Sequence, residues 1–287
     1  MAKYKEKGVQ TLLFLAAMTS IAAVVVICIF LFASCIPVFK ELGVSDFLLG
    51  TKWKPNNQPP SFGILPMIIG SVYITAGAII IGVPIGILTS VFMAYYCPKS
   101  MYKVLKPATN LMAGIPSVIY GFFGMIVIVP FVREWFGGNG NSILSASILL
   151  GIMVLPTIIG ISEAAVRAVP QAYYEGALAL GANKERAVFR VILPAAKSGV
   201  LAAVVLGIGR AIGETMAVIM VAGNQARIPN SILKGVRTLT TNIVTEMGYA
   251  ADFHRQALIA TGVVLFVFIL IINFCFSLLT NHKRRER

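Results

Sequence analysis

Two ionisable residues, Arg210 and Glu214, stand inside a long apolar stretch of this chain. They are four positions apart, so on a helix they would share one face and could pair. A charged side chain at the centre of a bilayer costs roughly 2.5–3.5 kcal/mol or more, and such residues normally face a bundle interior or a wet path. The planar donor fork of arginine matches phosphate or carboxylate oxygens. The pair therefore predicts an anion path in which Glu214 orients Arg210 and offsets its charge.

Nearby hydroxyl groups could complete such a path. Thr215 follows the pair directly, and Ser117 and Tyr120 in another apolar stretch could add hydrogen-bond donors. A transport site must bind its cargo weakly enough to release it. The glycines at 209 and 213 let helices approach closely and also leave space beside the charges. The alternative, a buried ion pair that only fixes helix packing, stays open.

The composition indicates which solvent surrounds this site. Of the 287 residues, 57% are hydrophobic and 12% are charged, and the mean hydropathy is +0.85. A soluble domain carries about 25% charged residues. The chain is therefore expected to be a membrane protein whose core packs against lipid and neighbouring helices. The four cysteines lie in or beside apolar runs without metal-ligand spacing, which predicts small buried side chains.

Six apolar stretches are long enough to cross a bilayer, which takes about 20 residues. They cover residues 11–36, 64–95, 108–131, 143–161, 199–221 and 257–280. The second contains Gly82, Pro84 and Gly86, which predict a kink or a tilt. The fold class is therefore an all-α polytopic membrane protein with six transmembrane helices.

The domain organisation follows from these stretches. An N-terminal helix and first outer loop would cover residues 1–63, and the transmembrane domain residues 64–280. A cytosolic loop would occupy 163–198 within that domain, and a basic tail 281–287.

The distribution of charge predicts the orientation. Most of the 24 lysine and arginine residues lie on the side that holds both termini and the loops 96–107 and 162–198. By the positive-inside rule both termini are therefore cytosolic. The net charge of +13 is then explained by topology and by contact with anionic membrane lipid. Nucleic acid is not needed as a partner.

The last outer loop, residues 223–256, carries apolar residues at helical spacing. They are Ile232, Val236, Leu239, Ile243 and Met247. This pattern predicts an amphipathic helix at the outer surface, which either caps the bundle or binds a partner.

The cytosolic loop predicts two short helices joined by a glycine turn. Pro170 suits a helix start, and Gly181 is a natural residue for the left-handed turn that ends a helix. Asn183 is a good N-cap for a second helix, and Pro194 would mark the bend into the fifth span. Tyr173, Ala177 and Leu180 could share one face of the first helix. The apolar face of the second helix would consist of Ala187, Val188, Val191, Ile192 and Ala195.

The spacing Glu175-Gly176-Ala177, Gly181, Val191 and Leu193-Pro194 resembles the EAA loop of ABC-importer permeases. Two residues depart from that pattern, Gly176 in place of alanine and Val191 in place of isoleucine. The resemblance implies the permease fold of type I ABC importers and a loop that docks onto a separate cytosolic ATPase subunit. That subunit would bind ATP, because this chain has no glycine-rich phosphate-binding loop ending in Lys-Ser/Thr. No cofactor, metal or catalytic residue is expected in this chain.

Further stretches narrow the resemblance. They are residues 209–218 (GRAIGETMAV), 222–224, 114–121, 47–53 and 237–240. Together they are similar to PstC-type permeases of phosphate-specific ABC importers, which lie in the prokaryotic cytoplasmic membrane. The resemblance implies a PstA-type second permease, two PstB-type ATPase subunits and an external PstS-type phosphate-binding protein. Phosphate would cross by alternating access, driven by the ATPase subunits.

Three alternatives remain at this point. One is an ABC permease for another oxyanion, such as sulfate or molybdate. Another is a proton-linked secondary anion transporter, although such folds usually show inverted repeats and need no docking loop. The third is a structural or assembly protein, which leaves Arg210 and Glu214 unexplained.

Overall fold

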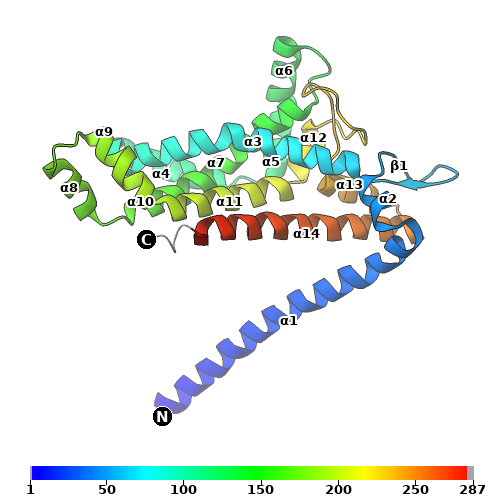
Figure 1. The fold of residues 1–287 in the computed structure, drawn as a ribbon, viewed down its shortest axis with the longest axis horizontal. Helices are drawn as coiled ribbons and strands as arrows, with labels where there is room; N and C mark the ends of the chain where they lie inside the picture. Colours follow the sequence, from blue (N-terminus) through cyan, green and yellow to red (C-terminus); the bar gives the residue numbers. More distant parts are fainter. Residues whose placement is uncertain (1, 283–287) are drawn as a thin grey trace.

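The computed structural model describes residues 2–282, and most of them are helical (Figure 1). Five helical segments are long and apolar enough to cross a membrane, or six if a bent pair counts as one span. The five are α1 (Ala2–Leu42), α3 (Leu65–Val91) with η1 (Phe92–Tyr96), α5 (Ser117–Phe123) through η2 (Gly124–Ile128) to α6 (Val129–Phe136), α7 (Ile143–Arg167), and α14 (Asp252–His282). Most of the predicted basic tail, residues 283–287, lies outside the described range.

Two of the predicted spans are interrupted. The third does not run from 108 to 131, because α4 (Lys99–Gly114) ends and α5 begins only at Ser117. Ile115 precedes Pro116, and a residue before proline avoids the helical region, so the chain is extended here with ψ of 125° and 141°. The fifth is divided between α11 (Lys197–Gly213) and α12 (Met216–Val221).

The centre of the bundle is the contact between α3 and α7, where glycines allow close approach. A Cβ added at Gly82 would lie 2.7 Å from Val154 Cγ2 and 2.9 Å from the Gly151 carbonyl oxygen. Pro84 lies inside α3, which stays helical from Leu65 to Val91. The glycines of this segment therefore serve helix packing, and they do not interrupt the span.

The N-terminal helix α1 begins away from the bundle and meets it toward its C-terminal end, beside α14 (Figure 1). Phe32 packs edge-on against Phe266 of α14, with ring centroids 6.4 Å apart. The chain then continues through α2 (Val44–Leu49) and a hairpin of β1 (Trp53–Lys54) and β2 (Ser61–Phe62), paired antiparallel. Phe47, Trp53 and Phe62 are buried in one apolar cluster with Leu239 and Leu258.

The predicted outer helix is shorter than its apolar pattern suggested. Only α13 (Leu239–Glu246) is helical, and Ile232 and Val236 lie in the preceding loop. Thr238 sets the start of α13, because its hydroxyl accepts from the Thr241 N–H while its own N–H donates to Thr241 Oγ1. The Val236 N–H donates to the Ala222 carbonyl oxygen at 2.9 Å, and this bond takes the place of one within a helix.

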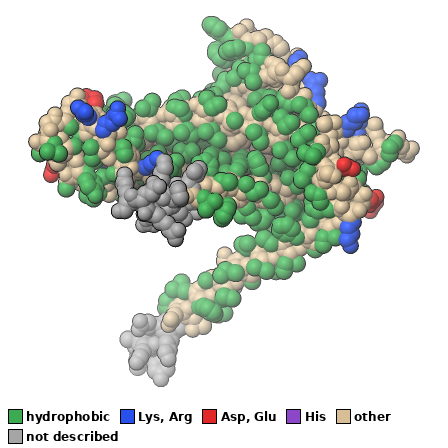
Figure 2. Space-filling view, viewed as in Figure 1, with side chains coloured by type: hydrophobic (Ala, Val, Ile, Leu, Met, Phe, Trp, Pro, Cys, Tyr) green, Lys and Arg blue, Asp and Glu red, His purple; other side chains and the backbone are tan. Residues whose placement is uncertain are grey.

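Figure 2 shows charged side chains gathered toward the two ends of the bundle, with apolar side chains covering the surface between them. One end holds α8 (Gln171–Ala179), α9 (Lys184–Ala187) and the last turns of α14 (Figure 1). The other holds α2, the hairpin and α13. This arrangement suits a protein that spans a bilayer along the bundle axis. The cytosolic location of the termini stays a prediction.

Candidate functional site

The two predicted site residues Arg210 and Glu214 do not pair. Arg210 lies in the last turn of α11, and its Nη1 is 3.4 Å from Thr157 Oγ1 on α7. Glu214 follows the helix in an extended conformation, and its Oε1 accepts from the N–H groups of Thr215 at 3.1 Å and Ala217 at 3.2 Å. Within residues 2–282 no ion pair joins the two.

The predicted i, i+4 contact is therefore wrong, because it required a helix that continues through Glu214. The helix ends at Gly213, so Glu214 leaves the face that carries Arg210. Its carboxylate is stabilised by free N–H groups at the start of α12.

Arg210 is consequently a half-buried cation that contacts the Thr157 hydroxyl. No carboxylate of the described residues lies within ion-pair distance of it. A Cβ added at Gly209 or Gly213 would meet nothing within 4 Å, whereas one added at Gly207 would lie 3.1 Å from Ile158 Cγ1. Gly207 thus serves packing against α7, whereas the other two glycines make no such contact within the described chain.

The predicted hydroxyl groups differ in their availability. Tyr120 is buried, and its hydroxyl donates to the Met112 carbonyl oxygen at 2.9 Å, so its single proton is occupied. Thr215 Oγ1 donates to the Gly213 carbonyl at 3.3 Å. Ser117 is half-buried, and its hydroxyl has no hydrogen-bond partner among the described residues. Ser117 is therefore the hydroxyl best able to donate to an anion.

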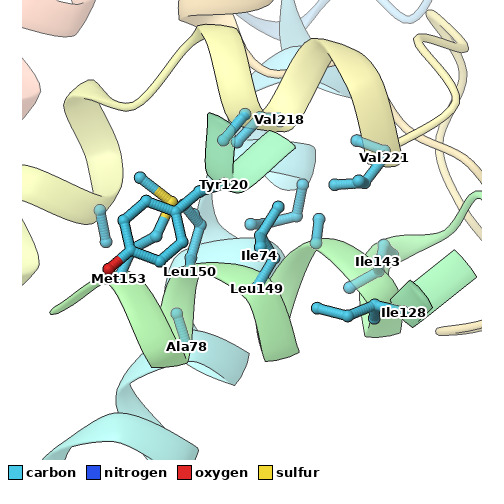
Figure 3. Close-up of a cluster of buried hydrophobic side chains, with 14 of the residues drawn as sticks. Ile74, Ala78, Tyr120, Ile128, Ile143, Leu149, Leu150, Met153, Val218 and Val221 are labelled. Carbon is cyan, nitrogen blue, oxygen red and sulfur yellow. The ribbon is translucent and has the colours of Figure 1, made fainter. Parts of the chain in front are cut away.

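The structure brings Arg210 and Tyr120 to one region of α7. Figure 3 shows Tyr120 beside Met153 and Leu150 of α7, with Val218 of α12 on the other side. Ala211, next to Arg210, is buried in the same cluster. Thr157, which contacts Arg210, lies four positions after Met153 and so on the same face of the helix. The candidate site is thus a junction of α5, α7, α11 and α12.

The second predicted site, the loop around Glu175–Pro194, has the expected turn. α8 ends at Ala179, Leu180 is its C-cap, and Gly181 takes φ +85°. The Ala182 N–H donates to the Ala177 carbonyl at 3.0 Å and the Gly181 N–H to the Leu178 carbonyl at 2.9 Å, which is a Schellman motif. Asn183 then caps α9, because its side-chain oxygen accepts from the Arg186 N–H at 2.9 Å. Both local predictions are confirmed.

The helix that follows the turn continues through a π-helical segment to the fifth span. η3 (Val188–Ile192) and α10 (Leu193–Ala195) extend α9, and the axis then bends by 69° into α11. The bend falls directly after Pro194 and α10, as expected. Leu193 is half-buried and Pro194 is exposed.

The buried faces of the loop differ from the prediction. Ala177, Ala187, Val188 and Ile192 are buried. Of the residues predicted to share one face with Ala177, Tyr173 is 56% exposed and Leu180 is 91% exposed. Ala195, predicted on the apolar face of the second helix, is exposed as well. Glu175 and Gly176 are also exposed, and Glu175 accepts a hydrogen bond from Gln171 at 2.8 Å. The tip of the loop thus presents unpartnered apolar surface.

Sequence reasoning missed a buried carboxylate beneath this loop, Glu163 of α7. It accepts from Tyr102 Oη at 2.7 Å, Lys106 Nζ at 2.7 Å and Arg167 Nε at 2.8 Å. The bond to the carboxylate raises the pKa of Tyr102 above its ordinary value. The available signal was the i, i+4 spacing of Glu163 and Arg167 at the end of an apolar span.

A second missed cluster lies among the outer loops. Glu246 of α13 accepts from Trp53 Nε1 at 2.8 Å, pairs with Arg237 and lies 2.9 Å from His254 Nε2. Trp53 comes from the first outer loop and His254 from the start of α14. The carboxylate therefore joins both outer loops to the last span.

Comparison with known proteins places this geometry in context. Residues 82–285 match the family described as "Binding-protein-dependent transport system inner membrane component". The probable ABC transporter permease protein YqgH of Bacillus subtilis is 40% identical, over 94% of this chain and 88% of that protein. The phosphate transport system permease protein PstC of Mesorhizobium japonicum is 34% identical, over 86% of this chain and 81% of that protein.

Solved structures show the same fold. An inward-facing MetNI methionine ABC transporter aligns with a TM-score of 0.63 at 20% identity, over 76% of this chain and 95% of its own. A bacterial ABC transporter involved in alginate import also gives a TM-score of 0.63, at 16% identity, over 94% of this chain and 96% of its own. The predicted fold class, a helical permease of the type found in ABC importers, is confirmed.

Proposed function

Since this chain belongs to the inner membrane components of binding-protein-dependent transport systems, we propose that it is the PstC-type permease subunit of an ATP-driven phosphate importer. The relatives named PstC support phosphate as the substrate. Membership of this family argues against a proton-linked secondary transporter and against a purely structural protein. The chain acts as a permease, and ATP is bound and hydrolysed by a separate subunit.

The observation that carries the substrate proposal is the environment of Arg210. Its guanidinium is half-buried in the apolar bundle, lies 3.4 Å from the Thr157 hydroxyl and has no carboxylate within ion-pair distance among the described residues. A planar cation of this kind binds two phosphate oxygens at once. A single arginine, assisted by the Ser117 hydroxyl, gives a contact weak enough to release the anion.

The loop of residues 170–196 supports an ATPase as the partner. Its turn is fixed by the Schellman motif at Gly181, Leu180 is exposed at that turn, and Tyr173 is exposed at the start of α8. Apolar side chains exposed on a well-defined turn suit a cleft on a second protein. When two PstB-type ATPase subunits close on each other, the docked loop would move with them and shift the transmembrane helices. This shift would change the side of the membrane to which the anion path opens.

The complete importer would contain three further kinds of subunit. A PstA-type permease would pair with this chain, and an external PstS-type protein would deliver phosphate at the end that holds the hairpin and α13. The proposed location is the cytoplasmic membrane of a prokaryote, which agrees with the inner-membrane description of the family.

Reconstitution of the purified complex in vesicles tests the function. Uptake of radioactive phosphate should require ATP and the loaded phosphate-binding protein, and Arg210→Ala should abolish uptake while the subunits still co-purify. Arg133→Ala removes an exposed arginine at the end of α6 and serves as the matched control. Near-normal phosphate uptake by the Arg210→Ala variant would contradict the assignment of Arg210 to the anion path. If the complex imports sulfate or molybdate with the binding protein for that anion, and imports no phosphate, the result would favour a permease for another oxyanion.

A further inference from the structure

One buried carboxylate holds α4 against α7 at the end of the bundle that carries the 170–196 loop. The Glu163 side chain is 1% exposed, and its two oxygens accept from three donors. Tyr102 and Lys106, both on α4, donate at 2.7 Å, and Arg167 of α7 donates at 2.8 Å. A buried carboxylate with several charge-assisted bonds fixes the geometry of its donors.

Arg167 extends this cluster to α3. Its Nη2 donates to the Met93 carbonyl at 2.7 Å, and its guanidinium lies 4.8 Å from the centre of the Tyr102 ring. Met93 belongs to η1, whose last carbonyls have no partner within the helix. The ends of α3, α4 and α7 nearest the 170–196 loop therefore meet at the Glu163–Arg167 pair.

The same η1 segment contacts the 170–196 loop. The Tyr95 and Tyr174 rings lie 5.4 Å apart, and Lys184 Nζ lies 4.6 Å from the centre of the Tyr96 ring. Tyr174 is on α8 and Lys184 is on α9, so both helices of the loop are connected to η1. A continuous series of contacts thus runs from the loop through η1 and Arg167 to Glu163.

α4 lies at the surface of the described structure, so the bonds to Glu163 are important for its position. All 16 of its residues are described, and none is buried. One side of α4 borders an open groove of about 800 Å³ that reaches from Lys106 past Gly114 to Ile119 of α5. The end of α4 is joined to the candidate site, because Met112 accepts the Tyr120 hydroxyl. A displacement of α4 would therefore move the wall beside Ser117 and Tyr120.

We propose that Glu163 is a positioning residue of the transport cycle, which passes the displacement of the 170–196 loop to α4 and so to the candidate anion path. The inference rests on the proposed function, since it assigns the route by which an ATPase acts on the path. Glu163 touches neither ATP nor the anion. Its role is to make α4 follow α7 and η1 when the loop moves.

The test measures coupling in the complete complex. Wild-type and variant complexes are reconstituted in vesicles with the loaded phosphate-binding protein, and phosphate imported is divided by ATP hydrolysed. Glu163→Gln keeps the size and the acceptor for Tyr102 but removes the charge that holds Lys106 and Arg167. The ratio is expected to fall about tenfold, a typical coupling strength, while ATP hydrolysis without the binding protein is retained.

Lys106→Met provides an independent variant, because it removes the charged one of the two α4 donors to Glu163 while Arg167 still neutralises the carboxylate. Lys103→Met is the matched control, since Lys103 is an exposed lysine on the same helix. The double variant Glu163→Gln/Lys106→Met should be no worse than the poorer single variant, since both changes break one link. If Glu163→Gln does not assemble, Lys106→Met alone decides between the outcomes.

Three results are informative. A reduced ratio for Lys106→Met with a normal ratio for Lys103→Met supports the proposal. A wild-type ratio in Lys106→Met, or equal losses in both lysine variants, overturns it. A wild-type complex that imports no phosphate contradicts the proposed function instead, and ATP hydrolysis stimulated by the binding protein in Lys106→Met would then still report on the link.

Discussion

Arg210 and Glu214 lie four residues apart, yet one contacts Thr157 of α7 and the other holds the first N–H groups of α12. The helix break at Gly213 separates their roles. Arg210 joins α11 to α7, and Glu214 stabilises the start of the next helix. Among the residues that the structure describes, no carboxylate pairs with the cation of the candidate path.

Glu214→Gln should retain most of the phosphate uptake. The glutamine side-chain oxygen can still accept the Thr215 and Ala217 N–H groups, whereas Glu214→Ala removes the acceptor and should destabilise the chain by about 1 kcal/mol. Vesicle uptake and thermal unfolding of the purified complex check both variants. Loss of uptake in Glu214→Gln, with stability unchanged, would show that the carboxylate charge matters to the path.

Ser117→Ala should slow uptake more than Tyr120→Phe. The Ser117 hydroxyl is free to donate to an anion, and losing such a bond costs about 1 kcal/mol, or several-fold in rate. The Tyr120 proton is held by Met112, so Tyr120→Phe should lower stability by a similar amount and leave uptake nearly unchanged. Initial uptake rates at saturating binding protein measure the difference, and the opposite order would contradict the assignment.

Gly181→Val should uncouple ATP hydrolysis from transport. A β-branched residue at φ +85° is strained by about 1–3 kcal/mol, so the turn between α8 and α9 would rearrange. Gly176→Ala is the control, because its Cβ would meet nothing within 4 Å and alanine favours the helix by up to about 1 kcal/mol. Phosphate imported per ATP should fall in the first variant only. Equal coupling in both would count against a role for the turn.

Glu246→Ala should destabilise the outer end of the protein. It removes the partner of Arg237, which is only 18% exposed, and breaking a buried pair typically costs about 3–5 kcal/mol. It also frees Trp53 and His254, so the 51–63 hairpin should become sensitive to protease added from outside. Glu134→Ala, an exposed carboxylate on α6, should leave the digestion pattern unchanged. An intact hairpin in Glu246→Ala would refute the structural role.

Local chemistry made some of these features predictable. Gly181 and Asn183 act within a few residues of themselves, so the turn and the cap could be derived from residue type and spacing. The bend after Pro194 was equally local. The long apolar stretches likewise identified a membrane bundle.

Other features depend on contacts that spacing does not reveal. The predicted Arg210–Glu214 pair failed because the helix ends at Gly213, where the chain turns to start α12. Glu163 and its partner Lys106 are 57 positions apart in the sequence, and Glu246 and its partner Trp53 are 193 positions apart. Such partners are set by how whole helices and loops pack, and a single sequence does not show that packing.

The two helix breaks, at Ile115–Pro116 and at Glu214–Thr215, have a mechanical consequence. An unbroken helix that tilts moves along its whole length, whereas a helix interrupted by a non-helical segment can tilt on one side of the interruption only. Beyond the breaks, α5 and α12 fit closely, since a Cβ added at Gly121 would lie 3.0 Å from the Ala217 Cα. α4 and α11 are therefore each joined to the closely packed pair of α5 and α12 by a short non-helical segment, at which the chain can change direction without disturbing that pair.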